Sequence, residues 1–391
     1  MSKMRVIVSG AAGVIGRRVV AQLAQTQQNI RLHRDQPQLH ITAIDKEDMT
    51  DLAGMSENPN SVRRPESASS SKRQASLITK KVDLQTADLP KLFSKADIVI
   101  HLASTATAST LDPVEAGREL LLFRRTLDAL AEAEVPHLIV ISSAMVYGAR
   151  HDNPIPLTED MPARPNLDFR WVMQKYSLEQ LAQEWAQSST LFFELSSERS
   201  RSVTILRPTA VVTEGQLGHL AAALQATRSK IRADGDPPAQ YLHADDLAAA
   251  VTTAVYTRYN GILNVAPDGW IPPDQLAELE GPRARLRVPA MVVKVVNALR
   301  WRWRFAPTPP GVVAYTVHSW IIANDRLREL GWTPAYSNEE AWVVSHDPGR
   351  WESLTLSRRK ILTAVAVGAV LTAGSIVAWI ISWIKHHHKA Q

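Results

Sequence analysis

The chain has 391 residues, of which 45% are hydrophobic and 21% charged, and its formal net charge is +5 at pH 7. These fractions exclude a disordered chain and a polytopic membrane protein. The small basic excess gives no indication of a nucleic-acid partner, so none is expected. The absence of cysteine excludes disulfides, thiolate metal sites and cysteine nucleophiles. The three histidines at 386–388 face different directions, so no bound metal is predicted.

Short apolar runs alternate with longer amphipathic segments from the N-terminus onward. The predicted strands are 5–9, 41–45, 98–102, 138–143 and 203–206, and the predicted helices are 13–25, 114–134 and 171–187. Short apolar strands without alternation suit a parallel sheet that is covered on both faces. Strands separated by helices of this length indicate βαβ crossovers, so the pattern predicts an α/β fold with a doubly wound parallel sheet. The first ten residues resemble a buried strand, and no signal peptide is expected.

One segment interrupts this alternation. Residues 50–76 contain seven serines and two prolines and show no apolar period. We predict a flexible insertion there, which is either regulatory or simply tolerated.

The C-terminal region has a different composition. Residues 361–384 carry no charge and are flanked by basic residues at 358–360 and 385. As a helix this segment would be about 36 Å long, enough to cross a hydrocarbon core of about 30 Å. We predict a linker at 346–360, a transmembrane helix at 361–384 and a short tail at 385–391; a buried core helix is the alternative. The basic residues before the span favour a single-pass membrane protein whose N-terminal domain is cytoplasmic.

Residues 289–305 form a second unusual segment. It is apolar at first and then alternates arginine with tryptophan from Arg300 to Arg304. Basic residues mixed with tryptophan suit a lipid headgroup surface. In the alternative interpretation, the apolar part is a helix of the substrate subdomain, and the Arg/Trp part covers that helix.

The strongest local motif is the glycine spacing Gly10-x-x-Gly13-x-x-Gly16 between a predicted strand and a predicted helix. This is the dinucleotide-binding fingerprint, which places a pyrophosphate at the positive end of the helix. Asp45 ends the second strand, where a carboxylate binds the ribose hydroxyls of NAD and repels a 2′-phosphate. NAD is therefore the predicted cofactor; Lys46 keeps NADP as the less favoured alternative, and Asp45 could instead only start a turn. Asp83 is either an adenine contact or a solvated loop residue.

Further motifs follow in a fixed order. They are DIVIHLAS at 97–104, ISSAMVYG at 141–148, LRPTAV at 206–211, YLHADDLA at 241–248, NVA at 264–266 and RELGWTP at 328–334. With the glycine spacing, they make the chain resemble the extended short-chain dehydrogenase/reductases, the NAD-dependent epimerase/dehydratase family, over about residues 4–345. The resemblance implies one NAD(P)-binding domain over 1–345 that includes a small C-terminal substrate subdomain.

The family uses a Ser-Tyr-Lys triad, and the resemblance assigns its serine to Ser143 and its lysine to Lys175. The spacing Tyr-x-x-x-Lys places the tyrosine at 171, but this chain has Trp171. An indole does not ionise near neutral pH, so Trp171 cannot transfer a proton as a phenol does. Tyr147 and Tyr176 are weaker candidates for that role. The resemblance places the cofactor against Gly10, Ala12, Gly13, Val14, Ile15, Gly16, Asp45, Asp83, Leu102, Ala103, Ser142, Lys175 and Pro208.

Two functions remain open at this point. The first is an oxidoreductase, epimerase or dehydratase with altered acid/base chemistry, whose small-molecule substrate is a nucleotide sugar or a lipid-linked compound. The second is a catalytically silent NAD-binding scaffold or sensor at the membrane. The resemblance also implies a homodimer, which would pair through the helices at 114–134 and 171–187.

Overall fold

The computed structural model describes residues 3–29, 37–49, 52, 76–103, 113–193, 200–228, 231–232, 236–281, 286–287, 290–303 and 309–346. Residues Met1–Ser345 form one compact unit. Almost all of the predicted insertion at 50–76 and the whole of the predicted span at 361–384 lie outside the described residues. Among the described residues, no helix combines the length and the apolar character that crossing a bilayer requires.

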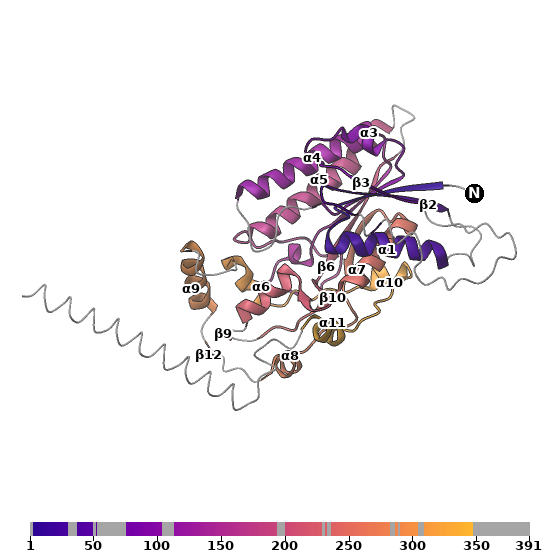
Figure 1. Ribbon diagram of the computed structural model, residues 1–391. Helices are drawn as coiled ribbons and strands as arrows, with labels where there is room; N and C mark the ends of the chain where they lie inside the picture. The colour runs from indigo at the N-terminus through magenta and orange to yellow at the C-terminus, as the bar shows by residue number, and fades with distance from the viewer. Residues whose placement is uncertain are drawn as a thin grey trace, which may run out of the picture. The chain divides into compact units, whose positions relative to one another are not determined.

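A seven-stranded parallel sheet forms the centre of this unit (Figure 1). Its strands are β1 (Lys3–Ser9), β2 (Gln38–Asp45), β3 (Ser76–Lys81), β4 (Ile98–His101), β5 (His137–Ile141), β6 (Ser202–Pro208) and β11 (Gly261–Val265). The strand order is β11-β6-β5-β4-β1-β2-β3. The chain therefore proceeds in one direction from β1 to β3 and in the other from β4 onward, which confirms the predicted doubly wound sheet. The order reverses between β1 and β4, and doubly wound folds bind nucleotides at such a point.

Helices cover both faces of this sheet (Figure 1). One face packs against α1 (Val14–Asn29), α7 (Ala244–Thr257) and α10 (Asp325–Glu329), and the other packs against α3 (Leu89–Phe93), α4 (Pro113–Glu132) and α5 (Arg170–Phe193). In β1, Val6 and Val8 belong to the first core, whereas Ile7 belongs to the second. Both faces of the strands are buried, which is why their sequences are continuously apolar.

A third core lies among the segments after β5 and in the C-terminal half of the unit. Its elements are η2 (Ala144–Tyr147), β7 (Ala210–Thr213), β8 (Gln216–Leu217), α6 (His219–Arg228), β10 (Tyr241–His243), α8 (Pro273–Glu280), η3 (Pro310–Thr316) and α11 (Asn338–Ser345). Large aromatic residues fill it, among them Tyr147, Phe169, Tyr315 and Trp320. The remaining elements are a pair of short parallel strands, β9 (Ile231–Arg232) and β12 (Leu286–Arg287), and helix α9 (Ala290–Arg302).

Candidate functional site

Two glycines at the turn from β1 into α1, Gly10 and Gly16, leave no room for a side chain. Gly10 has a φ of +76°, and a Cβ there would lie 2.6 Å from the backbone N of Ala103. A Cβ on Gly16 would lie 2.2 Å from the carbonyl oxygen of Gly10. The Gly10 N–H donates to the Ile44 carbonyl at 3.0 Å, which ties the loop to β2. The backbone can therefore approach a ligand closely at the N-terminus of α1.

A cavity of about 780 Å³ lies at the carboxyl ends of β1 and β2. Of the predicted cofactor residues, it is lined by Gly10, Ala12, Gly13, Asp45, Asp83, Leu102 and Ala103. Two cations, Arg17 and Lys46, also line it. Four acidic residues line it as well, Asp45, Glu47, Asp48 and Asp83. A concave site with close backbone, a carboxylate at the end of β2 and two cations fits the adenosine and pyrophosphate parts of a dinucleotide.

Asp45 is held in place by two backbone donors. Its Oδ2 accepts from Ala12 N at 2.9 Å, and its Oδ1 accepts from Glu47 N at 3.0 Å. A carboxylate has about four lone-pair sites, so both oxygens can accept a further bond from a ribose hydroxyl. Asp45 therefore starts a turn and also faces the cavity, and its two interpretations are compatible. Asp83 likewise accepts from Gln85 N at 2.8 Å within its own turn.

A second cavity of about 300 Å³ shares Leu102 and Ala103 with the first. Its other lining residues from the predicted set are Ile15, Ser142, Ser143, Trp171, Lys175 and Pro208. The structure thus brings the predicted serine and lysine to one cavity that adjoins the dinucleotide cavity. Val14 and Gly16 line neither one: Val14 is 50% exposed, and Gly16 provides close contact between the helix and the loop.

Ser143 follows the end of β5 and caps η2. Its Oγ accepts from Met145 N at 3.2 Å, and the residue is 2% exposed. The hydroxyl hydrogen remains available to donate to an oxygen in the cavity. Ser142 is also buried, and its Oγ has no hydrogen-bond partner among the residues that the structure describes. A buried hydroxyl without a partner is costly, so a ligand that bonds to it would gain affinity.

Trp171 lies in the first turn of α5 on the wall of this cavity. Its ring is 5.9 Å from the Phe169 ring and 6.0 Å from Lys175 Nζ, so the indole packs against the third core and faces the ammonium group. Neither weaker tyrosine candidate lines the cavity. Tyr147 is 1% exposed, its hydroxyl donates to Asn264 Oδ1 at 2.8 Å, and burial raises its pKa. Tyr176 is partly buried against the third core.

Glu119 of α4 also lines this cavity and is not among the site residues predicted from the sequence. Its side chain is 4% exposed, and its Oε1 lies 3.7 Å from Lys175 Nζ. Glu119 is the only carboxylate among the described residues that line the second cavity. The sequence carries a signal for it: Glu119 precedes Phe123 and Leu127 at intervals of four, so it lies on the core-facing stripe of the helix. A charged residue on that stripe is rarely buried without a function or a partner.

Two histidines also line the cavity. His101 is fully buried, and its Nδ1 lies 3.2 Å from Ser9 Oγ. Burial and the positive charge of Lys175 lower the pKa of His101 to about 4, so it is neutral near pH 7 and a poor proton acceptor. His219 begins α6 and is exposed.

A buried ion pair holds the helix that carries Lys175. Arg207 in β6 donates from Nε to Glu179 Oε1 at 2.9 Å and from Nη2 to Oε2 at 2.6 Å. Glu179 follows Lys175 by one helical turn, and both partners are at most 3% exposed. The pair is bidentate, so it fixes the rotation of α5 relative to the sheet. Lys175 is consequently presented to the cavity in one orientation.

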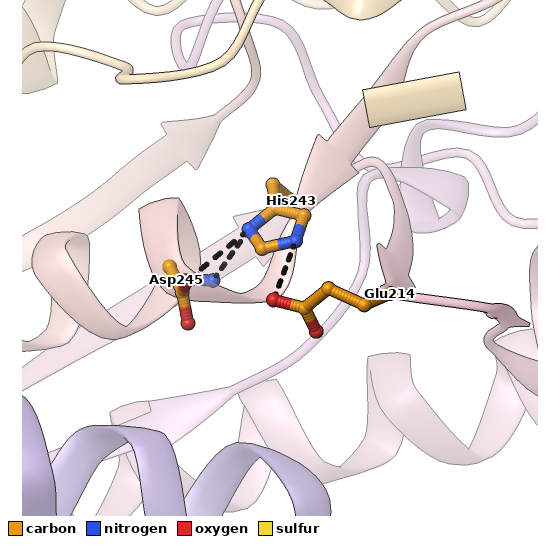
Figure 2. Close-up of side chains that lie close together, drawn as sticks. All are labelled: Glu214, His243 and Asp245. Atoms are coloured by element: carbon orange, nitrogen blue, oxygen red, sulfur yellow. Dashed lines mark hydrogen bonds and ion pairs between the residues drawn. The ribbon is translucent and has the colours of Figure 1, made fainter. Parts of the chain in front are cut away.

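One group of described residues, Glu214, His243 and Asp245, has the composition of a metal site (Figure 2). The Asp245 N–H donates to His243 Nδ1 at 3.3 Å, so Nδ1 carries no hydrogen. In the neutral ring Nε2 then carries the hydrogen, and it points toward Glu214 Oε1 at 3.5 Å. Arg18 of α1 already bridges the two carboxylates, with Nε 2.9 Å from Asp245 Oδ1. The chemistry does not fit a metal; the group joins α1 to β10 and α7.

Comparison with known proteins decides the family. Residues 6–266 match the NAD dependent epimerase/dehydratase family. The chain belongs to this family. The family's dependence on NAD agrees with the cofactor predicted from the glycine spacing and Asp45, and the resemblance drawn from the motifs is confirmed.

Solved structures with the same fold cover nearly the whole of the compact unit. MoeE5 in complex with UDP-glucose and NAD has a TM-score of 0.59 and 20% identity, over 87% of this chain and 97% of that chain. The UDP-N-acetylglucosamine 4-epimerase of Methanobrevibacter ruminantium has a TM-score of 0.57 and 19% identity, over 88% and 97%. The UDP-glucuronic acid 4-epimerase of Bacillus cereus has a TM-score of 0.56 and 17% identity, over 88% and 98%. No curated protein sequence is significantly similar to this chain. At these identities the likeness establishes the fold.

Proposed function

We propose that this protein is an NAD-dependent enzyme that oxidises and re-reduces a nucleotide sugar, with Glu119 as the proton acceptor that replaces the missing phenol. The observation that carries the proposal is the buried Glu119–Lys175 pair in the cavity of Ser143, beside the dinucleotide cavity. The substrate class is supported by the solved structures of similar fold, several of which are described as UDP-sugar epimerases or as complexes with UDP-sugars.

The residues of the second cavity divide the chemistry among them. NAD, when bound, supplies a hydride acceptor beside Leu102 and Ala103. Ser143 Oγ donates a hydrogen bond to the sugar oxygen that becomes a carbonyl, which stabilises the negative charge that develops there. Glu119 takes up the proton that this oxygen loses, and the Lys175 ammonium, 3.7 Å from Glu119 Oε1, pairs with the carboxylate. Return of the proton from Glu119 to this oxygen, with a hydride delivered to the opposite face of the carbonyl carbon, would give the epimer.

The burial of the side chains in this cavity supports the roles assigned to Glu119 and Lys175. Glu119 and Lys175 are 4% and 11% exposed at their side chains, so little water competes for the proton. Trp171 closes one wall with an apolar ring and contributes no ionisable group. Among the lining residues, Glu119 is therefore the proposed general base, because it is a proton acceptor beside Lys175 in the same cavity.

The decisive experiment replaces Glu119 by its neutral isostere. Glu119→Gln should lower turnover on a panel of UDP-sugars by about 10²–10⁴, because it removes the proton acceptor, while NAD binding measured by calorimetry stays unchanged. Asp128→Asn, an exposed acid on the same helix, is the matched control and should keep full turnover. Turnover that is equally fast in Glu119→Gln and in the parent protein would refute the role of Glu119.

A second candidate function is a silent NAD-binding scaffold, and Trp171 is the observation that favours it. That function predicts stoichiometric NAD in the purified protein and no redox change of the cofactor with any UDP-sugar. A slow reaction that depends on Glu119 would exclude it.

We also propose that residues 361–384 tether the protein to a membrane, with the N-terminal unit on the cytoplasmic side. The uncharged length of the segment and the basic residues at 358–360 support this. Because the chain has no cysteine, Ser2→Cys and Gln391→Cys can each be labelled alone in intact cells with an impermeant maleimide. Labelling at 391 and not at 2 is expected; the reverse pattern would overturn the orientation.

A further inference from the structure

Helix α9 exposes an apolar stripe. Its only fully buried described side chain is Val293, at 6% exposure, on the side that packs against η3. The adjacent side is apolar and exposed over three turns: Val292 at 48%, Val295 at 53%, Val296 at 40%, Leu299 at 46% and Trp303 at 63%. These positions recur at intervals of three and four, so they form one continuous face. A contiguous apolar face of this kind marks a surface that contacts something else.

The sequence around this helix is basic. Between residues 281 and 324 the sequence contains seven Lys and Arg and no Asp or Glu. The whole chain has a net charge of only +5, so the remainder of the chain is slightly negative. Arg302, an exposed cation, flanks the stripe on α9 itself, whereas Lys294 lies on the other side of the helix and pairs with Asp168 at 2.7 Å. The surface therefore combines an apolar face with a local positive charge.

We propose that α9 lies in the interfacial region of an anionic lipid bilayer. Its valine, leucine and tryptophan side chains enter the boundary between headgroups and acyl chains, and Arg302 at the edge of the stripe binds the acidic headgroups. A second copy of the chain fits this face less well, because two such surfaces would bring like charges together. The uncharged segment at 361–384 of the same chain supports the choice of a bilayer as the occupant.

This placement connects the lipid surface to the substrate cavity. Element η3 contacts both α9 and α6, and His219 and Leu220 of α6 line the second cavity. Docking of α9 would therefore orient the substrate cavity with respect to the bilayer through two packed elements. A substrate that is itself delivered from the membrane would benefit from such an orientation.

The test uses the cysteine-free full chain with one introduced label. Val295→Cys carries an environment-sensitive fluorophore, and Leu121→Cys, at a 66% exposed position on α4, carries the same fluorophore as the matched control. Both proteins are reconstituted in phosphatidylcholine vesicles with and without phosphatidylglycerol. Lipids that carry a quencher in the acyl chain should quench the label at 295 several-fold more than the label at 121, and more strongly with phosphatidylglycerol.

The outcomes separate the possible occupants. Equal quenching at the two positions, or quenching at 295 only by aqueous iodide, would overturn the proposal. A label at 295 that becomes protected with rising protein concentration, and stays insensitive to lipid quenchers, would assign the face to a second copy. Arg302→Gln should reduce the phosphatidylglycerol dependence at 295, whereas NAD binding by the same variant, measured by calorimetry, should stay unchanged and confirm that it folds.

Discussion

The two cavities that meet at Leu102 and Ala103 differ in how they are built. The dinucleotide cavity is built on a glycine loop whose backbone is closely packed, on the end of β2 and on the turn after β3. The second cavity is made of side chains from β5, α4, α5 and α6, which are distant in the sequence. A backbone site tolerates few substitutions, because glycine geometry defines it. A side-chain site can exchange its groups, and here Trp171 stands where the family pattern has tyrosine while Glu119 lies beside Lys175.

The largest expected effect concerns the exchange in the second cavity. In the Glu119→Gln background, Trp171→Tyr should restore turnover by about 10²–10⁴, because a phenol beside Lys175 supplies an ionisable group again. Ser143→Ala in the doubly substituted protein should abolish the gain, since the serine polarises the same oxygen. The measurement is the cofactor absorbance during reaction with UDP-sugars. If the rate stayed at the level of Glu119→Gln, a tyrosine at position 171 would be unable to accept the proton in this cavity.

The same contrast determines what the sequence could predict. The glycine spacing, Asp45 and the alternation of strands and helices are local patterns, and they predicted the sheet and the residues of the first cavity. The pairing of Glu119 with Lys175 depends on how α4 and α5 pack, and no local pattern contains that information. Glu119 could be recognised only as a charge on an otherwise apolar stripe. The exposed stripe of α9 was ambiguous for a related reason, because the sequence does not say which face of a helix packs inward.

The next effect tests the rigidity of the backbone cavity. Gly10→Ala should lower the free energy of unfolding by about 2–5 kcal/mol, because the residue has a left-handed φ and its new Cβ would lie too close to Ala103. The same substitution should abolish NAD binding. Gly117→Ala, in the helical part of α4 with nothing within 4 Å of the new Cβ, is the control and should stabilise the protein by about 0.5–1 kcal/mol. Urea unfolding and calorimetry check both variants. Normal NAD affinity in Gly10→Ala would show that the loop is more adaptable than its geometry implies.

A smaller effect concerns the stability of the folded protein in acid, which depends on two buried histidines. Burial is the main cause that lowers the pKa of His101 and His137 from 6.5 to about 4. The unfolded chain binds these protons at higher pH than the folded chain does, so stability is full above pH 6.5 and falls as the pH decreases toward 4. Each histidine should account for about 3 kcal/mol of that loss. Urea unfolding across this interval should show about half the loss in His101→Leu, whereas His151→Gln, at an exposed position, should keep the whole of it. An unchanged slope in His101→Leu would mean that the imidazole is already protonated in the fold.

The smallest effect is the choice of cofactor at Asp45. Its carboxylate already accepts two backbone N–H groups and faces the first cavity, so ribose hydroxyls would add charge-assisted bonds to oxygens that are already fixed in place. Asp45→Asn keeps the shape of the side chain and removes the charge. NAD should bind about tenfold more weakly, corresponding to roughly 1.4 kcal/mol, because hydrogen bonds to a charged group contribute about that much or slightly more. The same change removes the repulsion of a 2′-phosphate, and Lys46 and Arg17 in the same cavity would then attract it. Calorimetry with both cofactors should therefore show weaker binding of NAD and tighter binding of NADP, so that the preference for NAD decreases. If NADP bound the parent protein more tightly than NAD, Asp45 would be only the start of a turn, and the two cations would govern the choice of cofactor.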